Sequence, residues 1–69
     1  MTQSEKAKAW RERQGYTHKQ LAELTGFSRT AIQGFERGLV KGKTVTERAM
    51  LRYKLACAGI VNKPDFDWE

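Results

Sequence analysis

The sequence predicts a small all-α domain of about four helices with a short C-terminal tail. Helix formers and helix-capping patterns recur along the chain, no useful strand-like alternation of apolar and polar residues appears, and the single proline, Pro64, lies near the C-terminal end. A chain of 69 residues forms one core and buries only about 60% of its unfolded surface. We therefore expect a binding protein, because such a chain is too small for a deep catalytic cleft.

The first expected helix covers residues 4–14, which are rich in helix formers. Gly15 follows as a plausible C-terminal cap. Ala7 and Trp10 are three residues apart and therefore share one face, which we expect to point into the core.

The second expected helix covers residues 18 to about 25. The sequence of residues 17–20, Thr-His-Lys-Gln, is a capping box in which the threonine hydroxyl and the glutamine side chain each bind a free amide. Leu21 and Leu24 are expected to face inward, and Gly26 ends the helix.

The third expected helix covers residues 29 to about 37 and begins directly after Ser28, an N-cap residue. Ile32 and Phe35 form its inner face, and Gly38 follows it. Two short helices joined by a tight turn containing glycine are the outline of a helix-turn-helix motif.

A basic connector, residues 39–43, leads to the fourth expected helix. Thr44 and Glu47 match a second capping box, and the helix runs to about Ala58 before Gly59. One apolar stripe of this helix is expected to close the core over Trp10 and Phe35; its residues are Val45, Ala49, Tyr53, Ala56 and Ile60.

A second apolar stripe on the fourth helix contains Leu51, Leu55 and Ala58. It is either more core or a surface for self-association, and we prefer a homodimer. We divide the chain into a domain of residues 1–61 and an acidic, aromatic tail of residues 62–69. The tail rings are further dimer candidates, although packing on the chain's own core and disorder stay open; they are Phe66 and Trp68.

The positive charge is concentrated in the first part of the chain. Thirteen Lys and Arg residues face eight Asp and Glu residues, which gives a net charge of +5. Residues 1–43 hold nine of these cations and four of these anions, whereas residues 44–69 hold four of each. This asymmetry favours a surface that binds a polyanion, and a merely solubilising surface is the alternative.

The sequence from Trp10 to Thr17 resembles the end of the first helix in Cro/phage-repressor (XRE-type) DNA-binding domains. Residues 21–28, Ile32 and the Glu-Arg-Gly of residues 36–38 are similar to the helix-turn-helix of that family. The resemblance covers residues 7 to about 43. It implies a lambda-repressor-like fold and binding to double-stranded DNA.

The third helix carries the expected DNA-reading residues. With Ile32 and Phe35 inward, helical spacing places its polar residues on the opposite face. The resemblance implies base reading by Ser28, Arg29, Thr30 and Gln33, and backbone contacts from His18, Arg37, Lys41 and Lys43. It also implies that Arg11 and Glu36 pair as structural support.

Gly34 departs from the family, in which a longer polar side chain is usual. A glycine inside a helix costs about 0.5–1 kcal/mol relative to alanine, so a reason is needed. A close approach to DNA or to the neighbouring helix would supply one, and neutral drift is the alternative.

Other kinds of chemistry are not supported. Gly38 and Gly42 are separated by three residues, whereas a phosphate-binding loop needs four. Cys57 and His18 lack partners at the spacing of a zinc site or a nucleophilic centre. We expect no cofactor, no metal, no small-molecule effector and no membrane insertion, since the longest uncharged apolar run, residues 55–61, is far too short to span a bilayer.

Together these features predict a transcriptional regulator, most simply a homodimeric repressor or autorepressor of phage or mobile-element type. It would act by occupying an inverted-repeat operator in the cytoplasm of a bacterium or phage-infected host, associated with the nucleoid. Two alternatives stay open. One is a DNA-binding antitoxin or operon autoregulator whose tail engages a protein partner, and the other is a helix-turn-helix used only for protein contact.

Overall fold

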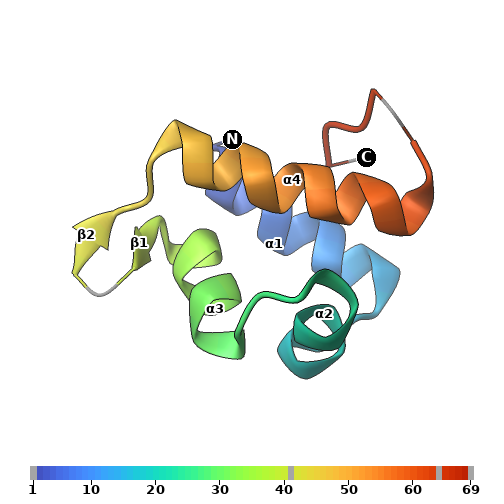
Figure 1. The fold of residues 1–69 in the computed structure, drawn as a ribbon, viewed down its shortest axis with the longest axis horizontal. Coiled ribbons are helices and arrows are strands. Elements are labelled where there is room, and N and C mark those ends of the chain that lie inside the picture. The colour runs from blue at the N-terminus through green and yellow to red at the C-terminus, as the bar shows by residue number, and fades with distance from the viewer. Residues whose placement is uncertain (1, 41, 64, 69) are drawn as a thin grey trace.

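The computed structural model describes residues 2–40, 42–63 and 65–68. Within them, four helices and one small hairpin form an all-α domain, as predicted (Figure 1). None of these helices is long and apolar enough to cross a membrane. The elements are α1 (Gln3–Gln14), α2 (His18–Thr25), α3 (Arg29–Arg37), β1 (Leu39–Val40), β2 (Lys43–Thr44) and α4 (Glu47–Val61).

The first three helices end where the sequence predicts, and α2 and α3 also begin there, whereas α1 begins at Gln3, one residue earlier than expected, with Thr2 as its N-cap. Thr17 caps α2, since its Oγ1 accepts a hydrogen bond from the amide of Gln20 at 3.1 Å and the Gln20 side chain accepts one from the Thr17 amide at 2.8 Å. Gly15 and Gly26 end α1 and α2 with φ of 76° and 81°, a left-handed conformation that glycine adopts without steric cost. The predicted ends of these helices are confirmed.

The start of α4 differs from the prediction. Lys43 and Thr44 pair with β1 in an antiparallel hairpin, and the Val45 amide donates to the Gly38 carbonyl at 2.9 Å. The chain therefore turns into the helix two residues later than expected. Thr46 is the N-cap, and its Oγ1 accepts from the Ala49 amide at 3.1 Å.

The end of α4 also differs. The helix passes through Gly59 and continues to Val61 because Ile60 and Val61 pack against the core. Asn62 ends it with φ of 53°, a left-handed value that asparagine tolerates better than most residues.

The core lies between α1, α3 and α4, with α2 packed against α3 and α4. All seven aromatic side chains of the sequence take part in one network. Phe35 stacks on Tyr53 with ring centroids 4.7 Å apart, and Tyr53 reaches Trp68 at 5.5 Å. The expectation that α4 closes the core over Trp10 and Phe35 is confirmed, since all three elements contribute to one buried cluster.

Two details of the predicted core are wrong. The buried residues of α4 are Met50, Tyr53 and Cys57. Of the five residues predicted for the inner stripe, only Tyr53 is among them, so the buried side of the helix is rotated from the predicted one. Leu24 is 55% exposed, whereas Leu21 is fully buried, because α2 presents only its Leu21 side to the core.

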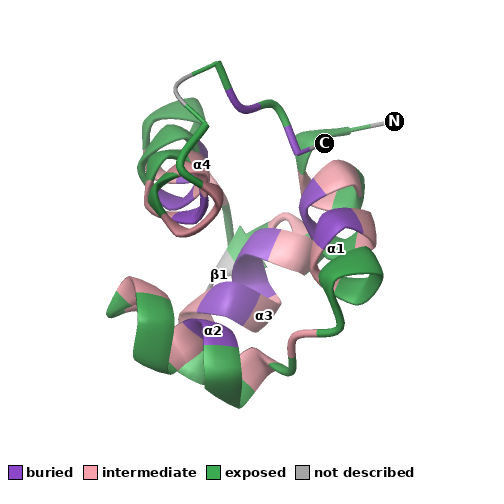
Figure 2. Ribbon diagram, turned by 90° about the vertical axis from the view of Figure 1, so that its right-hand side faces the viewer, coloured by how far each residue is buried: buried purple, intermediate pink, exposed green. Residues whose placement is uncertain are grey.

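The C-terminal tail is part of the core. Figure 2 shows buried tail positions passing from the end of α4 towards α1, and these are Phe66 and Trp68. The Trp68 indole donates to Gln3 Oε1 at 2.8 Å, and its carbonyl accepts from Arg13 Nη2 at 2.6 Å. Phe66 and Trp68 are therefore wrong as dimer candidates, because both rings are already covered by their own chain.

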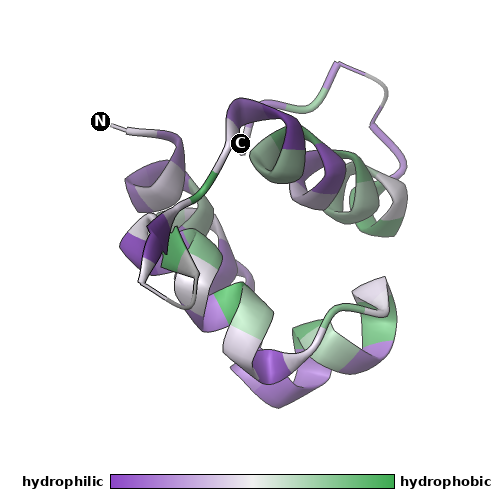
Figure 3. Ribbon diagram, turned by 60° about the vertical axis from the view of Figure 1, so that its left-hand side comes forward, coloured by the Kyte–Doolittle hydropathy of each residue, from purple (hydrophilic) through white to green (hydrophobic). Residues whose placement is uncertain are grey.

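The outer side of α4 carries two exposed leucines among exposed arginines. Figure 3 shows hydrophobic residues along much of this helix, and two of them, Leu51 and Leu55, are 52% and 60% exposed. Ala58 is half-buried and packs against the core. Leu51 and Leu55 are called the outer leucines below.

Candidate nucleic-acid interface

A tight turn holds α3 directly behind α2. The Thr25 hydroxyl donates to the Leu21 carbonyl at 2.7 Å, and the Phe27 amide donates to the Thr25 hydroxyl at 3.3 Å. Ser28 then caps α3, since its Oγ accepts from the Ala31 amide at 3.0 Å. The first exposed residues of α3 are thereby fixed relative to α2.

The two faces of α3 differ sharply in burial. Ile32 and Phe35 lie in the core, whereas Arg29 and Thr30 are exposed and Gln33 is half-buried. Residues 29 and 30 lie four and three positions before residue 33, so all three share the side turned away from the core. This side offers a cationic guanidinium, a hydroxyl and an amide, all of which can hydrogen bond with a partner.

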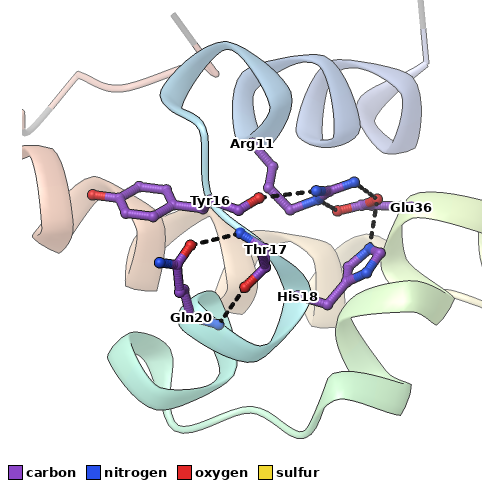
Figure 4. Close-up of polar contacts among 6 residues, drawn as sticks. All are labelled: Arg11, Tyr16, Thr17, His18, Gln20 and Glu36. Atoms are coloured by element: carbon purple, nitrogen blue, oxygen red, sulfur yellow. Dashed lines mark hydrogen bonds and ion pairs between the residues drawn. The ribbon is translucent and has the colours of Figure 1, made fainter.

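An ion pair ties α3 to α1. Arg11 Nε donates to Glu36 Oε2 at 2.7 Å and Arg11 Nη2 donates to Glu36 Oε1 at 3.1 Å, as Figure 4 shows. Arg11 Nη1 also donates to the Tyr16 carbonyl at 3.0 Å. The hydrogen bond with Glu36 raises the pKa of the Arg11 guanidinium further above its ordinary value. The predicted pairing is present, and it fixes the angle at which α3 leaves the core.

His18 joins the same cluster from the first turn of α2. Its Nε2 lies 3.2 Å from Glu36 Oε1, and its side chain is 31% exposed. Around this contact lies a shallow pocket of ≈ 230 Å³ between α1, α2 and α3; it is lined by Lys8, Arg11, His18, Gln33, Glu36 and Arg37. Five of these six side chains, all except Lys8, were singled out from the sequence as structural or DNA-contacting residues.

Lys8 is the residue of this pocket that sequence reasoning missed. It lies one turn before Arg11 on α1, and the spacing of three residues was the available signal, because it places both cations on one face. Lys8 is exposed at the rim, so it adds a mobile positive charge to a pocket that already contains Arg37.

The remaining predicted contacts lie after α3. Arg37 and Lys43 are exposed, Lys43 on β2, and Lys41 lies outside the described residues. Gly34 is buried, which favours the suggested approach to a neighbouring helix over an approach to DNA. Burial gives the reason for a small residue there.

The arrangement can bind but offers little for catalysis. In the described part of the chain, no group of three or more His, Cys, Asp and Glu residues is placed to hold a metal ion. Burial raises the pKa of the Cys57 thiol to about 12, which leaves it far from a reactive thiolate at neutral pH.

The sequence model of the helix-turn-helix family matches residues 8–47, which is more than half of the chain and includes the second part of α1, all of α2 and α3, and the hairpin. The chain belongs to the helix-turn-helix family. The predicted resemblance to the Cro/phage-repressor type is thereby confirmed, and this helix-turn-helix protein is assigned to a family of DNA-binding transcription regulators. No curated protein and no solved structure matches it significantly.

Proposed function

We propose that the helix-turn-helix protein is a homodimeric transcriptional repressor that binds an inverted-repeat operator in double-stranded DNA. The observation that carries the proposal is the division of α3 into a buried side, Ile32 and Phe35, and an outer side with exposed Arg29 and Thr30. A recognition helix inserts such an outer side into the major groove. Repression then follows from occupancy of a promoter, as the phage or mobile-element resemblance implies.

Base reading is assigned to the first two turns of α3. Arg29 suits the O6 and N7 acceptors of guanine, and Gln33 suits N6 and N7 of adenine. Thr30 can contact a thymine methyl group or a phosphate. Ser28 already accepts a hydrogen bond from its own helix, so its remaining contribution is the donation of its hydroxyl proton.

Backbone contacts are assigned to cations at the edges of α3 and to His18. Arg37 and Lys43 are exposed and positive, and His18 lies beside Arg37 in the pocket next to α3. Lys41 is assigned to the same role from its place in the sequence. Each phosphate that is neutralised adds roughly 0.9 to the slope of log K against log salt concentration.

Dimerisation is assigned to the outer leucines of α4, together with the neighbouring Ala58. Two leucines more than half exposed on one helix form an apolar surface that a second copy can cover. A two-fold dimer places two recognition helices about 34 Å apart, which matches half-sites one helical turn apart. The short α3 helix alone contacts too few bases to define an operator.

The proposal is tested by in vitro selection of bound DNA, followed by titration of the selected duplex at several salt concentrations. We expect an inverted repeat among the selected sequences and an affinity that falls steeply with salt. Binding without sequence preference and without a salt slope would refute the DNA assignment.

The antitoxin alternative finds no support in the tail. Its two aromatic rings are buried by the chain's own α1 and α4, so they are not free to engage a partner protein. Copurification of a second protein that depends on Phe66 or Trp68 would reopen that alternative.

A further inference from the structure

We propose that DNA binding by this protein takes up a proton at His18, so that an imidazolium lies between Glu36 and a backbone phosphate. The proposal rests on the proposed function, because it concerns the same DNA interface. It adds a dependence of operator affinity on pH that neither the family assignment nor the sequence predicts.

One side of the imidazole faces a fixed acceptor. Glu36 is only 6% exposed, and its two oxygens accept hydrogen bonds from Arg11. A carboxylate only accepts hydrogen bonds, so the contact of 3.2 Å requires a proton on His18 Nε2 (Figure 4).

The protonation of the other ring nitrogen, Nδ1, determines whether His18 can also donate a hydrogen bond to a phosphate. With a proton on Nε2, a neutral imidazole has a lone pair on Nδ1. In the described part of the chain, Nδ1 has no hydrogen-bond partner. A phosphate oxygen is also a hydrogen-bond acceptor. A neutral His18 has one N–H group, so it can donate to Glu36 or to the phosphate, and its other nitrogen lone pair repels the second acceptor. Only the imidazolium donates to both.

The charges around His18 set the direction of the coupling. Lys8 and Arg11 face it from α1, and Arg37 and Glu36 face it from α3. Together these groups are three cations and one anion. A phosphate beside the ring adds a second anion, which favours protonation. Binding therefore takes up a proton, and by linkage affinity rises as the pH falls.

The composition of the chain makes this coupling measurable. His18 is the single histidine among 69 residues, so a change in imidazole ionisation on binding has one source. The ring is partly exposed, and its proton can exchange with solvent in both states.

The experiment measures the dissociation constant for the selected operator between about pH 5.5 and 8.5 at constant ionic strength. Affinity per protomer should rise as the pH falls, by at most about tenfold per pH unit, which is the limit for uptake of one proton. Calorimetry in buffers with different ionisation enthalpies should report the same proton uptake directly.

Two variants separate His18 from the other cations. His18→Gln still binds the operator through the remaining contacts, but its affinity should not change with pH in this range. Lys19→Gln is the matched control, because it removes an exposed cation from the adjacent position of α2 and should keep the full pH dependence.

Each outcome has a distinct meaning. Operator binding by the natural protein that does not change with pH overturns the proton coupling, and so does a pH dependence that persists in His18→Gln. Failure to bind any selected DNA at every pH overturns the proposed function instead.

Discussion

Arg11 and Glu36 form a two-point ion pair between α1 and α3, with nitrogen–oxygen distances of 2.7 and 3.1 Å. Both side chains are almost covered, at 12% and 6% exposed, so each charge depends on the other for solvation. The same guanidinium binds the Tyr16 carbonyl, which lies between α1 and α2. One side chain therefore orients the two helices of the motif against the core.

Glu36→Gln should destabilise the folded protein by about 2–3 kcal/mol, because it leaves the Arg11 charge without its partner. Urea unfolding followed by circular dichroism measures this loss. Glu23→Gln is the control, since Glu23 is exposed on α2 and its substitution should change the free energy of unfolding by less than about 0.5 kcal/mol. Equal effects of the two substitutions would show that the ion pair is not a structural support.

Signals that lie close together in the sequence predicted the motif well. The capping box at Thr17 and the left-handed turn at Gly26 each depend on residues within one helical turn, so both could be read from the sequence. The polar side of α3 followed from helical spacing once Ile32 and Phe35 were placed inside.

Features decided by distant contacts were missed. Thr44 and Thr46 are both plausible N-caps, and the choice depends on whether Thr44 pairs with β1, which its own neighbours do not reveal. The packing of the C-terminal tail depends even more on distant contacts. Trp68 contacts Gln3 and Arg13, residues more than fifty positions earlier, and local sequence carries no record of such contacts.

Trp68→Ala should remove about 3–5 kcal/mol of stability, because it empties a fully buried site between α1 and α4. A domain of this size has a free energy of unfolding of roughly 3–10 kcal/mol in total, so we expect much of the variant to be unfolded near room temperature. Thermal and urea unfolding measure the change. Trp68→Phe keeps an aromatic ring but loses the indole donor to Gln3. Its stability should therefore lie between that of the natural protein and that of Trp68→Ala.

Asp65→Ala is the control for the tail, because Asp65 is exposed and its loss should cost less than about 0.5 kcal/mol. An unfolding midpoint for Trp68→Ala equal to that of the natural protein would mean that the tail does not close the core.

Leu55→Glu should convert the proposed dimer into a folded monomer, because it places a charge in an apolar interface. Sedimentation equilibrium measures the mass, and circular dichroism checks the fold. Leu24→Glu is the matched control, since Leu24 is similarly exposed, at 55% against 60%, but lies on α2. A natural protein that stays monomeric at every concentration would exclude the outer leucines as a dimer surface.

Alkaline pH should destabilise the protein from about pH 9 upwards. Burial raises the pKa of Cys57 from 9.0 to about 12 and raises the pKa of Tyr53 as well. Above pH 9 the unfolded chain releases these protons while the folded chain retains them. Their contribution to stability is therefore fully present below the pKa of the unfolded state, and it is lost as the pH rises through the pKa of the folded state. Urea midpoints measured across this range test the sign.

Cys57→Ala should make the alkaline loss less steep, because one of the two buried acids is gone. Both groups sit on the inner side of α4 and are fully buried, so the substitution keeps the effect of burial on Tyr53 and removes the smaller part of its pKa shift that comes from Cys57. An alkaline profile identical to that of the natural protein would assign the loss to other groups.

Arg29→Ala and Lys43→Ala should weaken DNA binding in different ways, because they occupy different parts of the proposed interface. Arg29→Ala removes a base contact, which should cost about 1–3 kcal/mol at the operator and relax the preference at one base pair. Lys43→Ala removes a phosphate contact, so it should weaken all sequences alike and lower the salt slope by roughly 0.9. Titration of the operator and of a single-mismatch series at two salt concentrations separates the effects. If both variants lost affinity equally on every sequence, α3 would contact only the DNA backbone, and base reading would have to come from another part of the protein.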